Sequence, residues 1–153
     1  MWSRLALLIT LAALAGCGGH STATANCPSS GYRVSVGDQG ATGSLVGMVG
    51  VIARRTSACH LRADLTLAVQ QKADGRWQTI QPMTGNPAHT RLVGLLKRDA
   101  PIGHNWAWWN YCGPHGQFRL LASADGHNAT VTVTPPVCNS GGTGPGSIRA
   151  FPP

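Results

Sequence analysis

The chain contains no glutamate, and its only acidic side chains are five aspartates among 153 residues. Lysine and arginine number 12, which gives a formal net charge of +7, yet charged residues make up only 11% of the chain. The acids that favour helices are therefore missing, whereas Gly (20) and Pro (10) are abundant. This composition disfavours long solvent-exposed helices and favours short strands joined by turns.

Clustered charge is also missing. Basic residues are adjacent only at Arg54-Arg55 and Lys97-Arg98, and the chain has no run of five or more. Because a nucleic-acid-binding domain needs a basic stripe within a recognisable module, we expect no nucleic-acid partner. The positive balance is typical of a soluble charged surface, and it is compatible with weak attraction to anionic lipid or wall polymer.

The first apolar stretch is too short to cross a bilayer. Leu5 to Ala15 spans 11 residues, whereas a membrane-spanning helix needs about 20. With Arg4 before it, the stretch is typical of the hydrophobic region of a signal peptide. Two signal-peptide cleavage sites are possible. Ala13-Leu14-Ala15 has the small-x-small form of an ordinary cleavage site, whereas Leu14-Ala15-Gly16-Cys17 closely resembles a bacterial lipobox, in which cleavage precedes a diacylglycerol-bearing cysteine.

The number of cysteines distinguishes between these two cleavage sites. The chain has five cysteines, an odd number, so ordinary cleavage would leave an unpaired thiol at Cys17 in an exported protein. Lipidation of Cys17 removes that thiol and leaves an even set. We therefore predict a cleaved lipoprotein signal peptide at residues 1–16 and a lipidated Cys17 followed by a flexible tether to residue 26. We expect residues 27–153 to form a disulfide-bonded domain that is extracytoplasmic and lipid-anchored to the cell membrane.

The remaining cysteines are Cys27, Cys59, Cys112 and Cys138. Four cysteines in an exported domain of this size indicate two disulfides, for which three connectivities are possible. We favour Cys27–Cys59 and Cys112–Cys138, whose partners are 32 and 26 residues apart.

Apolar residues after residue 27 recur with the period of strands. Residues 32–36, 65–69, 118–122 and 128–134 alternate apolar with smaller or polar side chains, and residues 45–53 are apolar on both faces. The first pattern predicts half-buried strands, and the second predicts a covered central strand.

Turn signals separate these segments. Asp74-Gly75 and Asp125-Gly126 are typical of two-residue hairpin turns, and no segment shows a convincing helical period. The sequence therefore predicts an all-β fold, an antiparallel β-sandwich of about seven or eight strands that follows the signal-peptide helix.

Residues 106–117 combine three tryptophans, a tyrosine and Cys112-Gly113-Pro114, the opening of a thioredoxin-type motif. The fourth position of that motif is His115 instead of cysteine, and a strand pattern follows in place of a helix. A redox site of this type needs the second cysteine and a helix N-terminus, so we discard that interpretation.

The two-residue period of a strand predicts which face each residue of the same run occupies. If Cys112 points inward to form its disulfide, then Trp106 and Trp108 share its face, together with Asn110, which would need backbone partners in an adjoining loop. Trp109 and Tyr111 then lie on the opposite face. A loop or the C-terminal tail could cover these two rings. Alternatively, they form an aromatic platform for a sugar or a partner and are the candidate ligand-binding residues.

Metal and catalytic motifs are missing. None of the six histidines has the spacing of a metal site, and no G-x-S-x-G motif marks a nucleophile. We therefore predict no catalytic residues, no metal and no cofactor.

Several elements together resemble a known family. They are an early cysteine before a strand at Cys27, "GATG" at 40–43, "TSACHL" at 56–61, W-x-N-x-C ending at Cys112, and "PPVC" at 135–138. In this order they resemble the exported, actinobacterial-type lipoproteins classed as domain of unknown function 4232, from about residue 27 to residue 153. The family usually has an Asn-Thr-Gly turn where this chain has residues 55–57. The resemblance implies an immunoglobulin-like sandwich in the cell envelope, and it brings no catalytic residues.

These observations favour a non-catalytic, lipid-anchored envelope module that acts in binding or in surface organisation. Its partners would be the membrane, through the lipid anchor, and an envelope polymer or protein. The alternative is a domain that binds carbohydrate or envelope polymer through Trp109 and Tyr111. A third hypothesis, an extracytoplasmic enzyme, has no identifiable catalytic residues.

Overall fold

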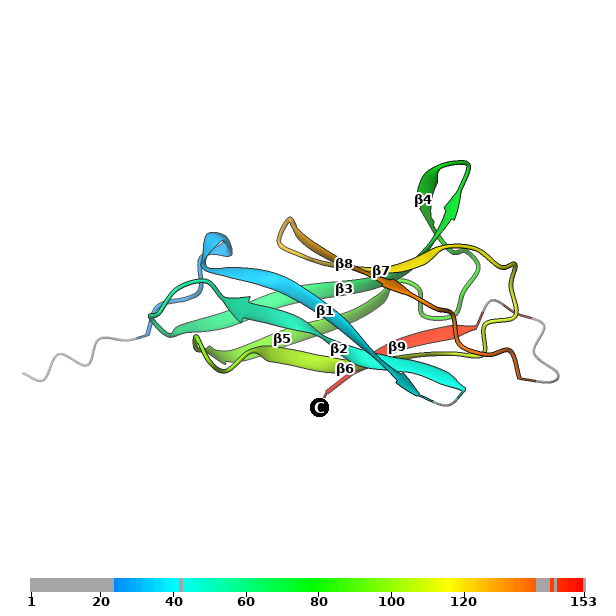
Figure 1. Cartoon of the computed structure of the whole chain (residues 1–153). Helices are drawn as coiled ribbons and strands as arrows, with labels where there is room; N and C mark the ends of the chain where they lie inside the picture. The colour runs from blue at the N-terminus through cyan, green and yellow to red at the C-terminus, as the bar shows by residue number, and fades with distance from the viewer. Residues whose placement is uncertain (1–23, 42, 140–143, 145, 153) are drawn as a thin grey trace, which may run out of the picture.

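The computed structural model describes residues 24–41, 43–139, 144 and 146–152. These residues form two antiparallel sheets packed face to face, with one short 3-10 turn, η1 (Ser29–Gly31), before the first strand (Figure 1). The predicted all-β antiparallel sandwich is thus confirmed, with nine strands in the described residues against the seven or eight expected. The immunoglobulin-like assignment stays a prediction.

Each sheet combines hairpins of consecutive strands with antiparallel neighbours that are distant in the chain. The first sheet has the order β1-β2-β6-β9, with β1 (Tyr32–Ala41), β2 (Ser44–Ala53), β6 (Ile102–Trp109) and β9 (Ser147–Phe151). The second has β3 (Cys59–Ala73) and β7 (Phe118–Ala124) at its centre, β8 (His127–Val133) at one edge, and β4 (Arg76–Thr79) and β5 (Ala88–Leu96) sharing the other.

The two ends of the sandwich differ in their connections (Figure 1). Residue 24 enters at one end, which also carries the β2–β3 turn (54–58) and the β5–β6 turn (97–101); we call it the tether end. The opposite end, the far end, carries the β6–β7 link (110–117) and the segment that follows β8 (134–139).

Both predicted hairpin turns are confirmed. Ala73 pairs with Arg76 around Asp74-Gly75, and Ala124 pairs with His127 around Asp125-Gly126. All four turn residues have positive φ, between 47° and 80°. This is the geometry that matches the twist of two antiparallel strands and that favours Asp-Gly.

The second turn is held against the start of the first sheet. The hydroxyl of Tyr32, which is buried, donates a hydrogen bond to the Asp125 carboxylate. The ring of His127 packs edge-on against Tyr32 at 5.7 Å, and its Nε2 lies 2.8 Å from the Ser29 carbonyl oxygen. These contacts join the β7–β8 hairpin to β1, which belongs to the other sheet.

A single buried side chain bridges the place where β3 changes its edge partner. β3 pairs with β5 through Leu67 and with β4 from Gln70 onward. Between them, the Val69 N–H donates to Oδ1 of Asn86 (2.9 Å), and Nδ2 of Asn86 donates to the Val69 and Ile80 carbonyls (3.0 Å each). The Asn86 amide thus replaces a neighbouring strand, so the backbone of β3 stays hydrogen-bonded across the gap. No local motif in the sequence predicted this role.

The core changes character along its length. Towards the tether end it consists mainly of aliphatic side chains, with Tyr32 beside them, and towards the far end aromatic rings join aliphatic side chains such as Leu45 and Ile148. The fully buried side chains of the core include Tyr32, Val49, Val51, Leu65, Leu67, Leu92, Leu96, Trp106, Trp108, Phe118, Leu120 and Ile148.

Trp106 needs a glycine beside it. It lies opposite Gly47 on β2, and its Nε1 donates to the Gly37 carbonyl on β1 at 3.1 Å. A Cβ on Gly47 would come within 2.8 Å of the Trp106 ring and would collide with the Gly37 carbonyl oxygen. The indole therefore spans the width of β2 because position 47 has no side chain.

Candidate functional site

Both disulfides have the predicted pairing. Cys27 is bonded to Cys59, and Cys112 is bonded to Cys138, over sequence separations of 32 and 26 residues. Disulfides of this kind form and persist in oxidising compartments, so the domain belongs in an extracytoplasmic environment. Cys112 is therefore part of a structural bridge to a distant residue, and not of a C-x-x-C pair.

The N-terminal predictions fall mostly outside the described residues. Residues 1–16, Cys17 and the tether as far as residue 23 are among those that the structure does not describe. In the part of the chain that it does describe, no helix is long and apolar enough to span a membrane.

The aromatic run obeys the predicted alternation up to Trp109. Trp106 and Trp108 are fully buried and point into the core, and the intervening Ala107 and the following Trp109 are half-buried on the outer face of the sheet. The difference between the neighbouring Trp108 and Trp109 is thus confirmed.

The prediction that Tyr111 lies on the outer face is wrong. Tyr111 is only 5% exposed, and its ring packs edge-on against Trp108 (5.4 Å) and Phe118 (5.1 Å). The cause is Asn110, whose φ of +56° ends β6 and reverses the alternation. Tyr111 therefore turns inward, and an exposed platform cannot include it.

The pKa of the Tyr111 hydroxyl is raised because the group is buried. The hydroxyl donates to the Pro114 carbonyl at 3.1 Å, which satisfies its polar end within the β6–β7 link. The ring thus acts as a core residue with one satisfied polar atom, as buried tyrosines usually do.

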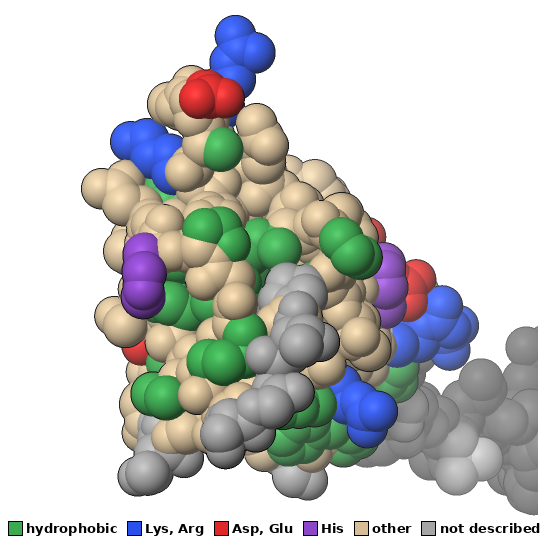
Figure 2. Space-filling model, turned by 90° about the vertical axis from the view of Figure 1, so that its right-hand side faces the viewer, with side chains coloured by type: hydrophobic (Ala, Val, Ile, Leu, Met, Phe, Trp, Pro, Cys, Tyr) green, Lys and Arg blue, Asp and Glu red, His purple; other side chains and the backbone are tan. Residues whose placement is uncertain are grey.

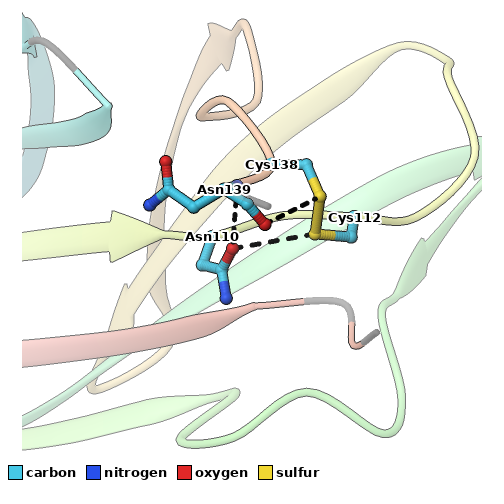
Figure 3. Close-up of a disulfide and its surroundings, with 4 residues drawn as sticks. All are labelled: Asn110, Cys112, Cys138 and Asn139. Atoms are coloured by element: carbon cyan, nitrogen blue, oxygen red, sulfur yellow. Dashed lines mark hydrogen bonds between the residues drawn. A yellow bond between two sulfur atoms is a disulfide. The ribbon is translucent and has the colours of Figure 1, made fainter. Parts of the chain in front are cut away.

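Asn110 finds the backbone partner that its position requires. Its Oδ1 accepts a hydrogen bond from the Asn139 N–H at 3.1 Å, in the segment after β8 (Figure 3). The same oxygen lies 3.7 Å from Sγ of Cys112; a disulfide sulfur carries no proton, so this is a packing contact. The predicted partner in an adjoining loop is confirmed, and it joins this link to the disulfide. Asn110 and Cys112 are only half-buried, however, so the prediction that they share the buried face of Trp106 and Trp108 is wrong.

Trp109, the candidate ligand-binding residue that is not buried in the core, lies on the outer face of the first sheet. Trp109 lies directly between Ser44 on β2 and Ser147 on β9, and all three side chains are half-buried on that face. Further along the same face, Met48 and Phe151 are 50% and 42% exposed, on either side of Asn105. The face is shallow, with a hollow of about 280 Å³ beside Met48.

The histidines that the structure describes are dispersed. His60, His89 and His115 are exposed, His104 contacts the Thr90 hydroxyl between the sheets, and His127 lies beside Tyr32. Across residues 24–152, as far as they are described, no group of three or more His, Cys or Asp side chains could hold a metal ion.

Comparison of the chain with known protein families, with curated proteins and with solved structures found no match. The resemblance to domain of unknown function 4232 therefore stays a prediction from the motifs. The site is defined by its own geometry: two disulfides, an inward aromatic cluster, and Trp109 on an otherwise shallow outer face.

Proposed function

We propose that this protein is a lipid-anchored module of the cell envelope, held outside the cell membrane by acyl chains on Cys17, where it binds or organises other components of the surface. The cysteine pairing carries this proposal. The two disulfides use four of the five cysteines, and the fifth, Cys17, is the last residue of a lipobox-like sequence. Acylation gives that cysteine a function, because several acyl chains hold a soluble domain firmly where one would be marginal.

The way the chain enters the domain supports anchoring. The His60 N–H donates to the Ala25 carbonyl, and the Cys27 N–H donates to the His60 carbonyl, both at 2.9 Å. The Cys27–Cys59 disulfide lies beside these bonds. The tether is therefore fixed to the start of β3 where it joins the domain. The domain that follows it contains the whole core and both disulfides.

The test is replacement of the acylated residue. Cys17→Ser should move the protein from the membrane fraction to a soluble or unprocessed form, and mass spectrometry of the wild-type N-terminal peptide should show the acyl chains. Both disulfides should remain in the variant, because neither uses Cys17. A mature, cleaved Cys17→Ser chain that stays in the membrane fraction would contradict the proposal.

A second candidate function is binding of an envelope polysaccharide by Trp109. The observation that favours it is the row formed by Ser44, Trp109 and Ser147 across three neighbouring strands of one face. An indole face flanked by hydroxyls suits a sugar ring, which stacks its C–H face on the indole and exchanges hydrogen bonds at its rim. Because Tyr111 is buried, Trp109 is the only member of the proposed pair that could take part.

Fluorescence titration with soluble envelope polysaccharide fragments tests this candidate. Binding should perturb the tryptophan emission of the wild type and should be lost in Trp109→Ala. Trp77→Ala, which removes a different half-buried tryptophan, on β4, is the matched control and should bind normally. Equal binding by Trp109→Ala and the wild type would rule out the stacking role.

A further inference from the structure

Strand register brings together the two basic pairs of the sequence. Val51 on β2 pairs with Ile102 on β6, and Cys59 on β3 pairs with Leu96 on β5. The turns that follow β2 and β5, residues 54–58 and 97–101, therefore lie side by side at the tether end (Figure 1). The four basic side chains that these turns carry are all exposed: Arg54, Arg55, Lys97 and Arg98.

Little negative charge opposes them. The two turns contain one acid, Asp99. Asp125, on the neighbouring β7–β8 turn, accepts the hydrogen bond of Tyr32, and Asp64, further along β3, is paired with Arg91 at 2.7 Å. At the far end, by contrast, the Lys and Arg side chains lie around the edges of the face and not at its centre (Figure 2).

Exposed apolar side chains lie next to the basic turns. On β5, just before Lys97, Val93 and Leu95 point outward and are 60% and 40% exposed. Beside them a hollow of about 670 Å³ extends across β3 to the N-terminal segment, with the exposed His60 and Arg62 in its lining. Apolar side chains surrounded by cations are typical of surfaces that sit at a membrane interface.

The tether keeps this end close to the bilayer. Six residues lie between Cys17 and Thr24, which are seven positions apart, so even a fully extended tether spans no more than about 25 Å. Because residues 25–27 are bonded to the start of β3, the chain leaves the domain at the end that carries the basic turns. Acyl chains on Cys17 would thus hold these side chains within a short distance of the headgroups.

We propose that the tether-end surface, formed by Arg54, Arg55, Val93, Leu95, Lys97 and Arg98, rests on the anionic headgroups of the membrane that holds the anchor. This inference rests on the proposed lipid anchoring and adds an orientation to it. Cations within a Debye length of an anionic surface, about 8–10 Å at physiological salt, are attracted to it. The contact holds the sandwich upright, with the far end directed away from the bilayer.

Vesicle partitioning tests the attraction without the anchor. The chain from Gly18 onward keeps the whole core and both disulfides, so it can be mixed with vesicles of phosphatidylcholine alone or with phosphatidylglycerol added. We expect binding to the anionic vesicles that falls with salt and that drops about fivefold for each basic residue removed, or roughly 25-fold in Arg54→Gln/Arg55→Gln. Lys97→Gln/Arg98→Gln should behave in the same way.

A matched pair at the opposite end controls for net charge. Lys72→Gln/Arg76→Gln removes two exposed basic residues from the β3–β4 hairpin and changes the net charge equally. It should leave partitioning within about twofold of the wild type, because those side chains lie away from the surface. Equal losses in the two pairs, or equal binding to both kinds of vesicle, would overturn the proposal. Circular dichroism checks that each variant is folded.

The two lysines of the chain report the orientation of the unmodified protein. Lys97 lies on the tether-end surface and Lys72 lies on β3 near the far end, and both are exposed. With the lipidated protein in anionic vesicles, amine acetylation should be several-fold slower at Lys97, relative to Lys72, than in neutral vesicles. An unchanged ratio would overturn the orientation.

These readouts separate this inference from the anchoring on which it rests. If Cys17 carries no acyl chains, the anchoring fails, while partitioning of the chain from Gly18 still tests the basic surface. If Cys17 is acylated and the lysine ratio does not change, the anchor stands and the orientation fails.

Discussion

The two halves of the sandwich reach a closed core by different means. In the half near the tether end, long strands pair with few interruptions, and the side chains between the sheets are mainly aliphatic, as at Val51, Leu61 and Leu96. In the half near the far end, an irregular link follows β6, and the space is filled by the rings of Trp108, Tyr111 and Phe118, with centroids 5.1–5.9 Å apart.

Regular strand pairing accounts for the aliphatic core of the half near the tether end, and the size of the aromatic rings accounts for the packing of the half near the far end. Where strands alternate without a break, branched aliphatic side chains fill the roughly 10 Å between two sheets at high density. Where the backbone leaves the ladder, as at Asn110, strand alternation ends and large rings pack edge-on against one another. The far half therefore combines a few large rings with aliphatic side chains such as Leu45 and Ile148, whereas the near half depends mainly on aliphatic side chains.

The largest expected effect tests that dependence. Trp108→Ala removes a fully buried ring and should lower the free energy of unfolding by about 3–5 kcal/mol. Trp109→Ala, one residue along on the outer face, should cost about 1 kcal/mol or less. Denaturant unfolding of both variants measures the difference. Equal losses would show that the two rings share one environment and that the described register of β6 is wrong.

Removing each disulfide compares the two halves directly. The loops that they close have nearly equal lengths, 32 and 26 residues, so a chain-entropy argument predicts a loss of about 3.5 kcal/mol in each double alanine variant. Thermal melts of Cys27→Ala/Cys59→Ala and Cys112→Ala/Cys138→Ala provide the measurement. A much larger loss for the second would show that the irregular far end depends on its disulfide for packing as well as for chain entropy.

The boundary between the halves should be sensitive to Asn86. Asn86→Ala leaves the buried N–H of Val69 without its partner and removes the Asn86 hydrogen bonds to the Val69 and Ile80 carbonyls, although the Val69 carbonyl still accepts from the Ile80 N–H, and it should cost about 2–3 kcal/mol. Gln81→Ala removes one hydrogen bond, to the Asn86 carbonyl, from an exposed side chain, and about 0.5 kcal/mol or less is expected. Amide exchange at Val69 should rise in the first variant and stay near its wild-type rate in the second.

The smallest effect concerns the two tyrosines, one in each half. Burial raises the pKa of both hydroxyls above 10, and at Tyr32 the hydrogen bond to Asp125 raises it further. The folded state therefore keeps these phenols protonated at pH values where the unfolded chain ionises. Their stabilising contribution is complete below pH 10 and is lost as the pH rises above that value.

Tyr32→Phe should flatten this alkaline loss more than Tyr111→Phe does, because burial, the hydrogen bond to Asp125 and the negative charge of Asp125 all raise the pKa of Tyr32, whereas burial alone raises that of Tyr111. Denaturant unfolding between neutral and alkaline pH tests the order. A steeper alkaline loss in Tyr32→Phe than in the wild type would contradict the stated direction of its pKa.

Features set by local sequence were predictable here. The Asp-Gly turns at residues 74 and 125 follow from the φ values that those residues tolerate. Likewise, the opposite environments of Trp108 and Trp109 follow from the period of a strand. The even set of cysteines predicted two disulfides, and the connectivity favoured among the three possible ones is the one observed.

Features set by distant segments were not predictable. The positive φ of Asn110 goes with its hydrogen bond to Asn139 and with the bond from the Cys112 N–H to the Gly144 carbonyl, some 30 residues along the chain. The alternation of side-chain directions expected for a strand does not reveal these contacts, so Tyr111 was predicted on the wrong face. The two basic pairs were visible in the sequence, but their adjacency depends on the registers of β2 with β6 and of β3 with β5.

The disulfides also decide how the protein would carry a mechanical load. If the proposed anchor held one end and a partner pulled on the other, tension that enters at Cys27 would pass through its disulfide into β3. Residues 28–58 and 113–137 lie inside covalent loops and cannot be drawn out. β1, β2, β7 and β8 thus stay in short loops while the rest of the chain extends, which limits how far a pull can unravel the domain.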